Sequence, residues 1–182
     1  DMIATLGSTP DGGRVETSVL LVERGAPSPA VARALELREH DLVWHLERLR
    51  RIGGRPRVLE RTAIPIALVP ELDVAHLRAG GSLYGFLAER HGLTADREEQ
   101  YLHVASPDPR ERRLLQLRGS RPVVRLRGLS VTSADVPFDC FEQVYPASDF
   151  VFYISGRSPG ELHAAGDGIA WLGSPVAGPS AD

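Results

Sequence analysis

The fold is decided by the stretch LVWHLERLRRIGGRPRVLE, residues 42–60, which has the pattern of a two-stranded hairpin. Gly53-Gly54 marks the turn, and Pro56 suits the start of the returning strand because proline cannot donate to a β-ladder. Side chains alternate between the two faces of a strand. One face of the first strand therefore begins apolar and ends in Arg48 and Arg50, where core residues are expected.

The length of the loop determines what lies opposite these arginines. A two-residue loop pairs Arg48 with Leu59. A loop of three or five residues instead pairs Arg48 with Glu60 and brings two guanidinium groups and one carboxylate together over an apolar floor. It also places Arg50 opposite Val58. The alternative is a solvated hairpin end in which the arginines extend into water. The hairpin alone favours that alternative, because ligand sites are few in any protein.

Length and composition describe an ordinary globular chain. Its 182 residues suffice for one domain with a sizeable core, and 25% charged and 42% hydrophobic residues are typical values. The net charge of −3 provides no general basic surface for nucleic acid. A single cysteine, Cys140, excludes an internal disulfide and fits a reducing compartment. No apolar run approaches the ~20 residues of a membrane span, and no signal-peptide pattern is present. We therefore expect a cytoplasmic protein.

The remaining sequence divides into a linker, one ordered domain and a tail. Residues 1–14 are rich in glycine and lack periodicity, which predicts a linker from an upstream domain. Residues 15–155 form the domain, and the Gly/Pro/Ala-rich residues 156–182 are expected to be mostly disordered. Within the domain we predict strands over 15–22, 97–105, 122–131, 138–145 and 150–154, helices over 28–37 and 108–117, a helical turn over 70–77, and a helix from an N-cap at Ser82 to Gly92.

A pattern of apolar residues repeats within the chain. Each copy contains a capped helix, a Leu-x-Leu segment, a strand, a turn and a second strand. The residues Leu35, Leu37, Val43 and Leu46 recur 80 positions later as Leu115, Leu117, Val123 and Leu126. Two copies are too few for a solenoid. They predict an α+β fold in which an antiparallel sheet, built by internal duplication, is flanked by helices.

Motifs of metal or nucleophilic chemistry are missing from the sequence. The six histidines show no pairing at metal-ligand spacing, and one cysteine makes a structural zinc site untenable. No P-loop, dinucleotide-binding or nucleophile-elbow motif is present. Cys140 lies in mid-strand on an apolar face, which favours a packed thiol over a nucleophile. We expect no cofactor, no metal and no catalytic residue.

Several short segments, in order, resemble a known family. They are LERLR (46–50), GRP (54–56), ERT (60–62), GSLYGFL (81–87), LLQLRGSRPV (114–123), VPFD (136–139) and Tyr145. Together they make the chain similar to the effector-binding (UTRA) domain of bacterial GntR-type transcription regulators of the HutC subfamily. No single segment is specific, but the ordered set covers nearly all of the predicted domain.

The resemblance implies a chorismate-lyase-like fold with a ligand pocket over the sheet, in a protein that acts as a homodimer. The family's effector contacts fall on Arg48, Arg50, Glu60, Ser82, Tyr84, Asp139 and Tyr145. Asp139 stands where the family usually has glutamate. Family members also carry an N-terminal winged helix-turn-helix, and no such segment precedes Val15. We therefore expect DNA contacts only through a domain of a longer parent protein.

The chemistry of these residues indicates a small anionic effector. Two arginines can hold an anion bidentately, the start of the Ser82 helix adds N–H donors, and Glu60 and Asp139 accept from hydroxyls. A sugar phosphate would use all of these groups, whereas a carboxylate metabolite would use the arginines alone. Two alternatives remain: a chorismate-lyase-like enzyme, because fold does not determine function, and a dimerisation module that binds no ligand.

Overall fold

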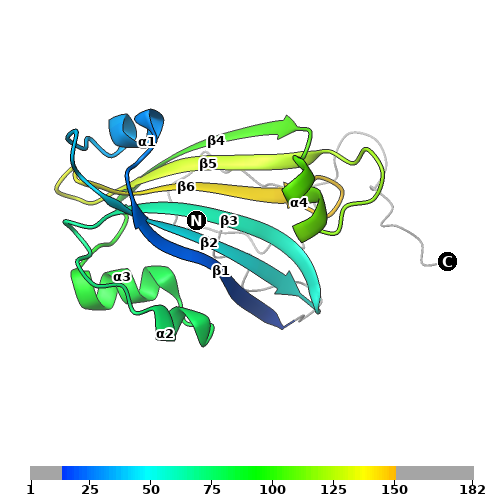
Figure 1. Ribbon diagram of the computed structural model, residues 1–182, viewed down its shortest axis with the longest axis horizontal. Coiled ribbons are helices and arrows are strands. Elements are labelled where there is room, and N and C mark those ends of the chain that lie inside the picture. Colours follow the sequence, from blue (N-terminus) through cyan, green and yellow to red (C-terminus); the bar gives the residue numbers. More distant parts are fainter. Residues whose placement is uncertain (1–13, 151–182) are drawn as a thin grey trace, which may run out of the picture.

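The computed structural model describes residues 14–150, which fold into one antiparallel sheet and short helices (Figure 1). In chain order the elements are β1 (Val15–Gly25), α1 (Pro29–Ala34), β2 (Val43–Ile52), β3 (Arg55–Pro65), α2 (Val74–Arg78), α3 (Leu83–His91), β4 (Arg97–Ala105), α4 (Pro109–Leu114), β5 (Val123–Val131) and β6 (Pro137–Pro146). The α+β class is confirmed. The predicted linker, last strand and tail lie outside the described residues, apart from Arg14 and Phe150.

The strand order β1-β2-β3-β6-β5-β4 confirms the internal duplication. Each half contributes an edge strand, a helix and a hairpin, and the halves meet where β3 pairs with β6. The two helices that precede the hairpins, α1 and α4, are shorter than the sequence predicts. They end early because Glu36 and Gln116, 80 positions apart, both adopt a left-handed φ of 54°. The helical turn predicted over 70–77 begins further along the chain, as α2, because the Asp73 side chain accepts a hydrogen bond from the N–H of His76 and caps the helix there.

The hairpin of β2 and β3 has the predicted register but not the predicted loop. Its turn contains two residues, Gly53 (φ 57°) and Gly54 (φ 75°), both left-handed as a type I′ turn requires. Beyond the turn Arg57 is an extra residue with no partner on β2, which makes a β-bulge. The bulge moves the pairing by one position, so Arg48 lies opposite Glu60. The pairing is confirmed, whereas the expectation of an odd loop is wrong.

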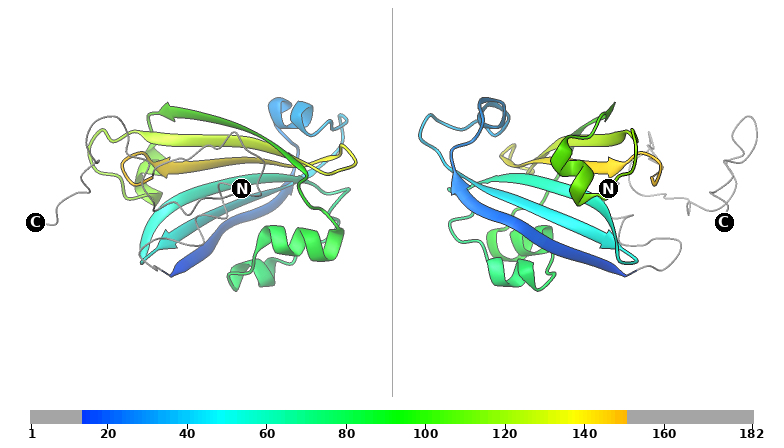
Figure 2. Two further views of the ribbon diagram at one scale, coloured as in Figure 1. Left: turned by 180° about the vertical axis from the view of Figure 1, so that it is seen from behind. Right: turned by 45° about the vertical axis from the view of Figure 1, so that its right-hand side comes forward.

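Helices cover the two faces of the sheet at different places (Figure 2). We call the face that carries Arg48 and Glu60 face A, and the opposite face, which carries Glu47 and Arg61, face B. On face A, Leu83 and Leu87 of α3 pack in one core with Trp44, Leu46 and Ile64. On face B, α1 packs through Leu35 against Val43 and Ala63, and α4 packs through Leu115 against Leu49, Leu59 and Val144.

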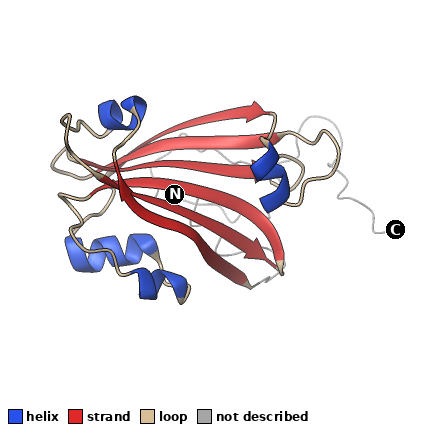
Figure 3. Cartoon of the chain, in the orientation of Figure 1, coloured by secondary structure: helices blue, strands red, loops and turns tan. Residues whose placement is uncertain are grey.

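The helices gather near the ends of the strands. Figure 3 shows α1, α2 and α3 at one end and α4 at the other. The middle of each face is therefore left to the side chains of the strands. In the part of the chain that the structure describes, no helix has the length and hydropathy needed to cross a membrane.

The turn of this hairpin generates the first prediction. A Cβ added at Gly54 would meet nothing within 4 Å, so substitution there costs only backbone strain. Gly54→Ala should lower the free energy of unfolding by about 1–2 kcal/mol, the cost of a left-handed L-residue. Gly54→Asn is the control, because asparagine tolerates this conformation, and should cost clearly less. Urea unfolding of the variants measures both effects, and equal losses would contradict a left-handed turn.

Candidate functional site

A buried carboxylate held by two arginines lies in the middle of face A. Arg48 Nη2 is 2.8 Å from Glu60 Oε2, and Arg50 Nε is 2.8 Å from Glu60 Oε1. The side chains of Glu60 and Arg48 are only 2% and 4% exposed, and that of Arg50 is 18% exposed. The pairing across the hairpin puts all three groups on the same face.

These ion pairs have short distances but poor hydrogen-bond alignment. Among residues 14–150, no aligned hydrogen-bond partner exists for Arg48 Nε, Arg50 Nε or either oxygen of Glu60. The two 2.8 Å contacts are therefore ion pairs without an aligned hydrogen bond. Buried polar groups in folded proteins are nearly always hydrogen-bonded, and buried charges are costly unless they are well paired. A cluster with this unused hydrogen-bonding capacity is suited to a polar ligand.

A second carboxyl group, Asp139 on β6, is tied to helix α3. The hydroxyl of Tyr84 donates to Asp139 Oδ2 at 2.7 Å, and the hydroxyl of Ser130 lies 3.5 Å from the same oxygen. The other oxygen, Oδ1, is buried without a partner among the described residues. Burial raises the pKa of Asp139 to about 7, although the Tyr84 hydrogen bond and the charge of Arg48 act in the opposite direction. Burial, with Asp139 nearby, also raises the pKa of Tyr84 well above its ordinary value.

Tyr145 joins the cluster at the far end of β6. Its hydroxyl donates to Gln143 Oε1, and burial followed by the charge of Glu60 raises its pKa. Gln143 lies directly opposite Glu60 in the β3–β6 pairing and is 3% exposed. The sequence prediction omitted Gln143. Strand alternation placed it on the same face as Asp139 and Tyr145, which was a usable signal.

Ser82 is the one predicted residue whose side chain is committed elsewhere. Its hydroxyl accepts the N–H of Gly85 at 3.1 Å and forms the N-cap of α3, as the sequence predicted. Ser82 is also exposed, and no contact joins its hydroxyl to the arginine cluster in the described structure. The helix that it caps supplies Tyr84 to the cluster instead.

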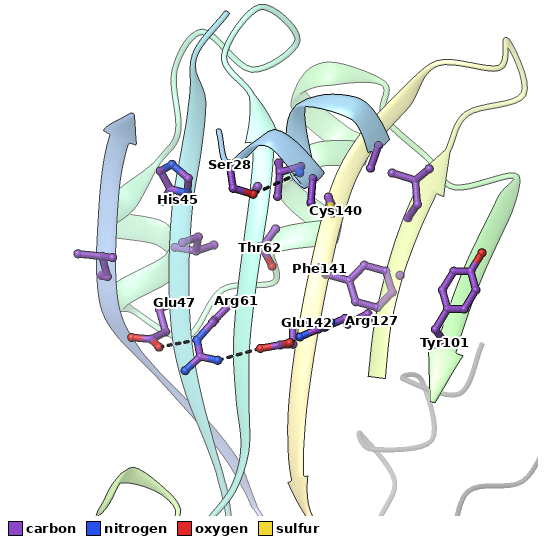
Figure 4. A pocket seen from close by; sticks show the side chains of 18 of the residues that line it. Ser28, His45, Glu47, Arg61, Thr62, Tyr101, Arg127, Cys140, Phe141 and Glu142 are labelled. Atoms are coloured by element: carbon purple, nitrogen blue, oxygen red, sulfur yellow. Dashed lines mark hydrogen bonds and ion pairs between the residues drawn. The ribbon is translucent and has the colours of Figure 1, made fainter. Parts of the chain in front are cut away.

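Face B carries a hollow of about 950 Å³ under α1 (Figure 4). Its floor is a row of alternating charges in which Arg61 lies 3.2 Å from Glu47 and 2.8 Å from Glu142, and Arg127 lies 2.7 Å from Glu142. Arg110 adds a bidentate contact to Glu47. Both carboxylates of this floor are therefore fully engaged by arginines of the same chain.

The hollow lies mainly under α1, and from α4 only Arg110 lines it. Under α4 the buried Glu111 pairs with Arg125 at 2.7 Å. Burial acts to raise the pKa of Glu111, but hydrogen bonds, first from Arg125, outweigh it and bring the pKa to about 2. The equivalent positions under α1 are Val31 and His45, which make no such pair. Because the charges of face B are satisfied and those of face A are not, the polar cluster on face A is the stronger candidate for a functional site.

Comparison with known proteins agrees with this fold. The model of the UTRA domain family matches residues 11–151. The ligand-binding domain of a GntR-family regulator from Bordetella bronchiseptica is 26% identical, with a TM-score of 0.75 over 83% of this chain and 93% of that one. The effector domain of PhnF from Mycobacterium smegmatis has a TM-score of 0.73 at 21% identity, over 85% of this chain and 94% of that one, and this likeness shows the fold alone.

A curated relative from Escherichia coli is the mannosyl-D-glycerate transport/metabolism system repressor MngR, 30% identical over 59% of this chain and 44% of the relative. The regulator GmuR of Bacillus subtilis is 23% identical over 69% of this chain and 52% of the relative. The chain thus spans about half the length of these proteins. The fold and the matches define a class, the effector-binding domains of GntR-family transcription regulators. Within that class, this chain belongs to the UTRA domain family.

The central carboxylate generates the second prediction. Removing one partner of a buried charge cluster leaves uncompensated charge, so Glu60→Ala should lower the free energy of unfolding by about 3–5 kcal/mol. Glu71→Ala, at an exposed position, is the matched control and should change it by no more than ~0.5 kcal/mol. Denaturant unfolding followed by circular dichroism measures both variants. If the two substitutions cost the same, Glu60 does not hold the arginines in place.

The raised pKa of Asp139 generates the third prediction. With a folded-state pKa of about 7 and an unfolded value near ~3.9, the contribution of Asp139 to stability is complete below the unfolded pKa and is lost as the pH rises through the folded pKa. The unfolding free energy of the parent minus that of Asp139→Asn should therefore fall from about pH 4 to about pH 7, by at most ~1.4 kcal/mol per pH unit. Unfolding curves at a series of pH values measure this difference. A difference independent of pH would contradict the assignment.

Proposed function

We propose that the polar cluster on face A binds a small anionic metabolite, a sugar phosphate, and that binding modulates the DNA affinity of the full-length regulator. The observation that carries this proposal is the buried group of Arg48, Glu60 and Arg50, with N–H donors that the described residues leave unused. Two guanidinium groups against one carboxylate leave a positive surplus. An anion would use that surplus, whereas a neutral ligand would not.

The rest of the cluster supplies partners for hydroxyl groups. Asp139 Oδ1 is a buried acceptor without a partner among the described residues, and Glu60 has accepting capacity at both oxygens. Hydrogen bonds to charged groups are the stronger kind, and bidentate arginine contacts fit phosphate geometry. A sugar phosphate would engage both the arginines and the carboxyl groups. A simple carboxylate metabolite would engage the arginines alone and would leave Asp139 unpaired.

The names of similar proteins support a carbohydrate effector. One relative is a repressor of a mannosyl-D-glycerate system, and one structural neighbour, at 22% identity, is the effector-binding domain of the trehalose repressor of Bacillus subtilis. Mannosyl-D-glycerate combines a sugar with a carboxylate, which is the chemistry that the cluster suits. We further propose that the full-length regulator belongs to the HutC subfamily, acts in the cytoplasm as a homodimer and contacts DNA through a separate winged helix-turn-helix domain.

In this proposal the domain binds its ligand without transforming it. The chorismate-lyase alternative shares the fold, but the matched relatives with curated names are transcription regulators, and no contact in the described structure favours the enzyme. Incubating the chain with chorismate and assaying for pyruvate discriminates between the two. Pyruvate release above the uncatalysed rate would favour the lyase.

The fourth prediction tests the ligand class. A thermal-shift panel should pair each sugar phosphate with its uncharged parent sugar. A ligand at about 100 times its dissociation constant adds roughly 2.7 kcal/mol to the stability of the folded chain. We expect phosphorylated members to raise the melting temperature and the parent sugars to leave it unchanged. If only uncharged or lipophilic compounds raise it, the anion site is wrong.

The ligand so identified is then titrated against arginine variants by calorimetry. Arg50→Ala leaves the Arg48–Glu60 pair in place and should weaken binding by about 1.5–3 kcal/mol, the range for a hydrogen bond to a charged group. Arg48→Ala should weaken it at least as much, provided that its circular dichroism spectrum shows a folded chain. Arg55→Ala, exposed at the tip of the same hairpin, is the control and should bind like the parent. Parent-like binding by both site variants would contradict the proposal.

A further inference from the structure

Strand β4 forms an edge of the sheet that is exposed on both faces. It pairs with β5 along its whole length, and its outer side has no partner strand among the described residues (Figure 1). Three of its large apolar side chains are exposed: Tyr101 by 67%, Leu102 by 36% and Val104 by 69%. Leu102 and Val104 lie on face A, whereas Tyr101 lies on face B at the rim of the hollow (Figure 4).

The opposite edge, β1, is protected in ways that β4 is not. Strand β1 has a bulge at Leu20, and helix α2 contacts it. Strand β4 pairs without a bulge from Arg97 to Ala105 and contacts no helix to a comparable extent. Natural sheets normally blunt a long, regular edge with bulges, charges or a covering element, because its free N–H and C=O groups bind other strands. Only the first half of β4 carries charges that could blunt it, at Arg97, Glu98 and Glu99.

The described part of the chain ends away from β4. The ring of Phe150 packs against that of Tyr145 on β6, with centroids 4.8 Å apart. In the sheet order, β5 separates β6 from β4. The last described residue, Phe150, therefore lies over β6 and not beside the free edge of β4.

We propose that a second copy of this chain pairs with β4 in an antiparallel arrangement centred on Tyr101, which joins two six-stranded sheets into one. The sequence of β4, REEQYLHVA, complements itself in this register. Tyr101 meets the partner's Tyr101 on face B. On either side of this aromatic pair, Glu99 faces the partner's His103. On face A, Leu102 faces the partner's Gln100.

Tyr101 is chosen as the centre because this register pairs the residues of the two β4 strands most completely. With Tyr101 at the centre, all nine residues of β4 have partners. Each Glu99, which contacts Arg97 of its own chain at 3.0 Å, then lies opposite the partner's His103, which can donate a hydrogen bond. Moving the centre of the pairing by one residue, to Gln100 or to Leu102, leaves two residues of each strand unpaired and separates Glu99 from that histidine. Nine residues a side is fewer than the about 20–30 of a standard interface, so we expect a dimer that dissociates on dilution. The inference rests on the proposed dimer and assigns it a surface.

Sedimentation velocity over a concentration series tests the surface. Tyr101→Glu places two like charges face to face at the centre and should weaken the dimer at least tenfold. Leu20→Glu, a matched substitution on the β1 edge, should dimerise like the parent. If Tyr101→Glu dimerises like the parent while the parent is a dimer, the β4 surface is wrong and the dimer proposal stands. A monomeric parent at all concentrations would overturn both, and loss of the dimer in Leu20→Glu alone would assign the interface to β1.

A charge exchange tests the register. Glu99→Lys and His103→Glu should each weaken the dimer, because each removes the complementary contact. The double variant places the new lysine opposite the new glutamate of the partner and should restore parent-like dimerisation. Within one chain these two positions are four residues apart on a strand and do not pair, so restoration points to the partner. If the double variant is as weak as the singles, the register centred on Tyr101 is wrong. Titrating the same variants with the sugar phosphates of the thermal-shift panel tests the ligand site separately.

Discussion

A single buried carboxylate, Glu60, organises the polar chemistry of this domain. Its charge is tolerated in the sheet only because Arg48 and Arg50 lie within 2.8 Å of its oxygens. That arrangement depends on the hairpin register, and the register depends on one extra residue, Arg57, beyond a two-residue turn. Without the bulge, alternation along the strand would turn the carboxylate toward the opposite face. The cluster therefore depends on a local feature of the backbone.

The duplicated halves explain why the cluster occurs once. Arg48 pairs with Glu60 in the first half, and Gly128 pairs with Phe141 at the equivalent place in the second. There the aromatic ring lies over the glycine, and a Cβ at Gly128 would meet the ring at 2.3 Å. The halves also differ on face B, where the second half has a buried ion pair under its helix and the first has a hollow. The same backbone unit thus supports a charged cluster in one half and an apolar contact in the other.

The sequence predicted most of the fold because the elements carry local signals. The caps Ser28, Ser82 and Asp108 all form as expected, and strand β4 has the predicted limits. It missed what depends on distant contacts. Loop length alone could not show that a bulge would change the register, since a bulge is a deviation of one residue in an otherwise regular strand. The Tyr84–Asp139 bond and the charge row of face B join residues far apart in sequence, and Gln143 carries no charge to mark it.

In the proposed function, the unused donors of face A, and not the satisfied charges of face B, receive the ligand. The most direct measurement is an NMR titration of the arginine Nε–Hε resonances with the sugar phosphates of the panel and with inorganic phosphate. We expect the signals of Arg48 and Arg50 to shift and to saturate as ligand is added, while those of Arg61 and Arg127 stay in place. Saturating shifts confined to Arg61 and Arg127, with Arg48 and Arg50 unmoved, would contradict it.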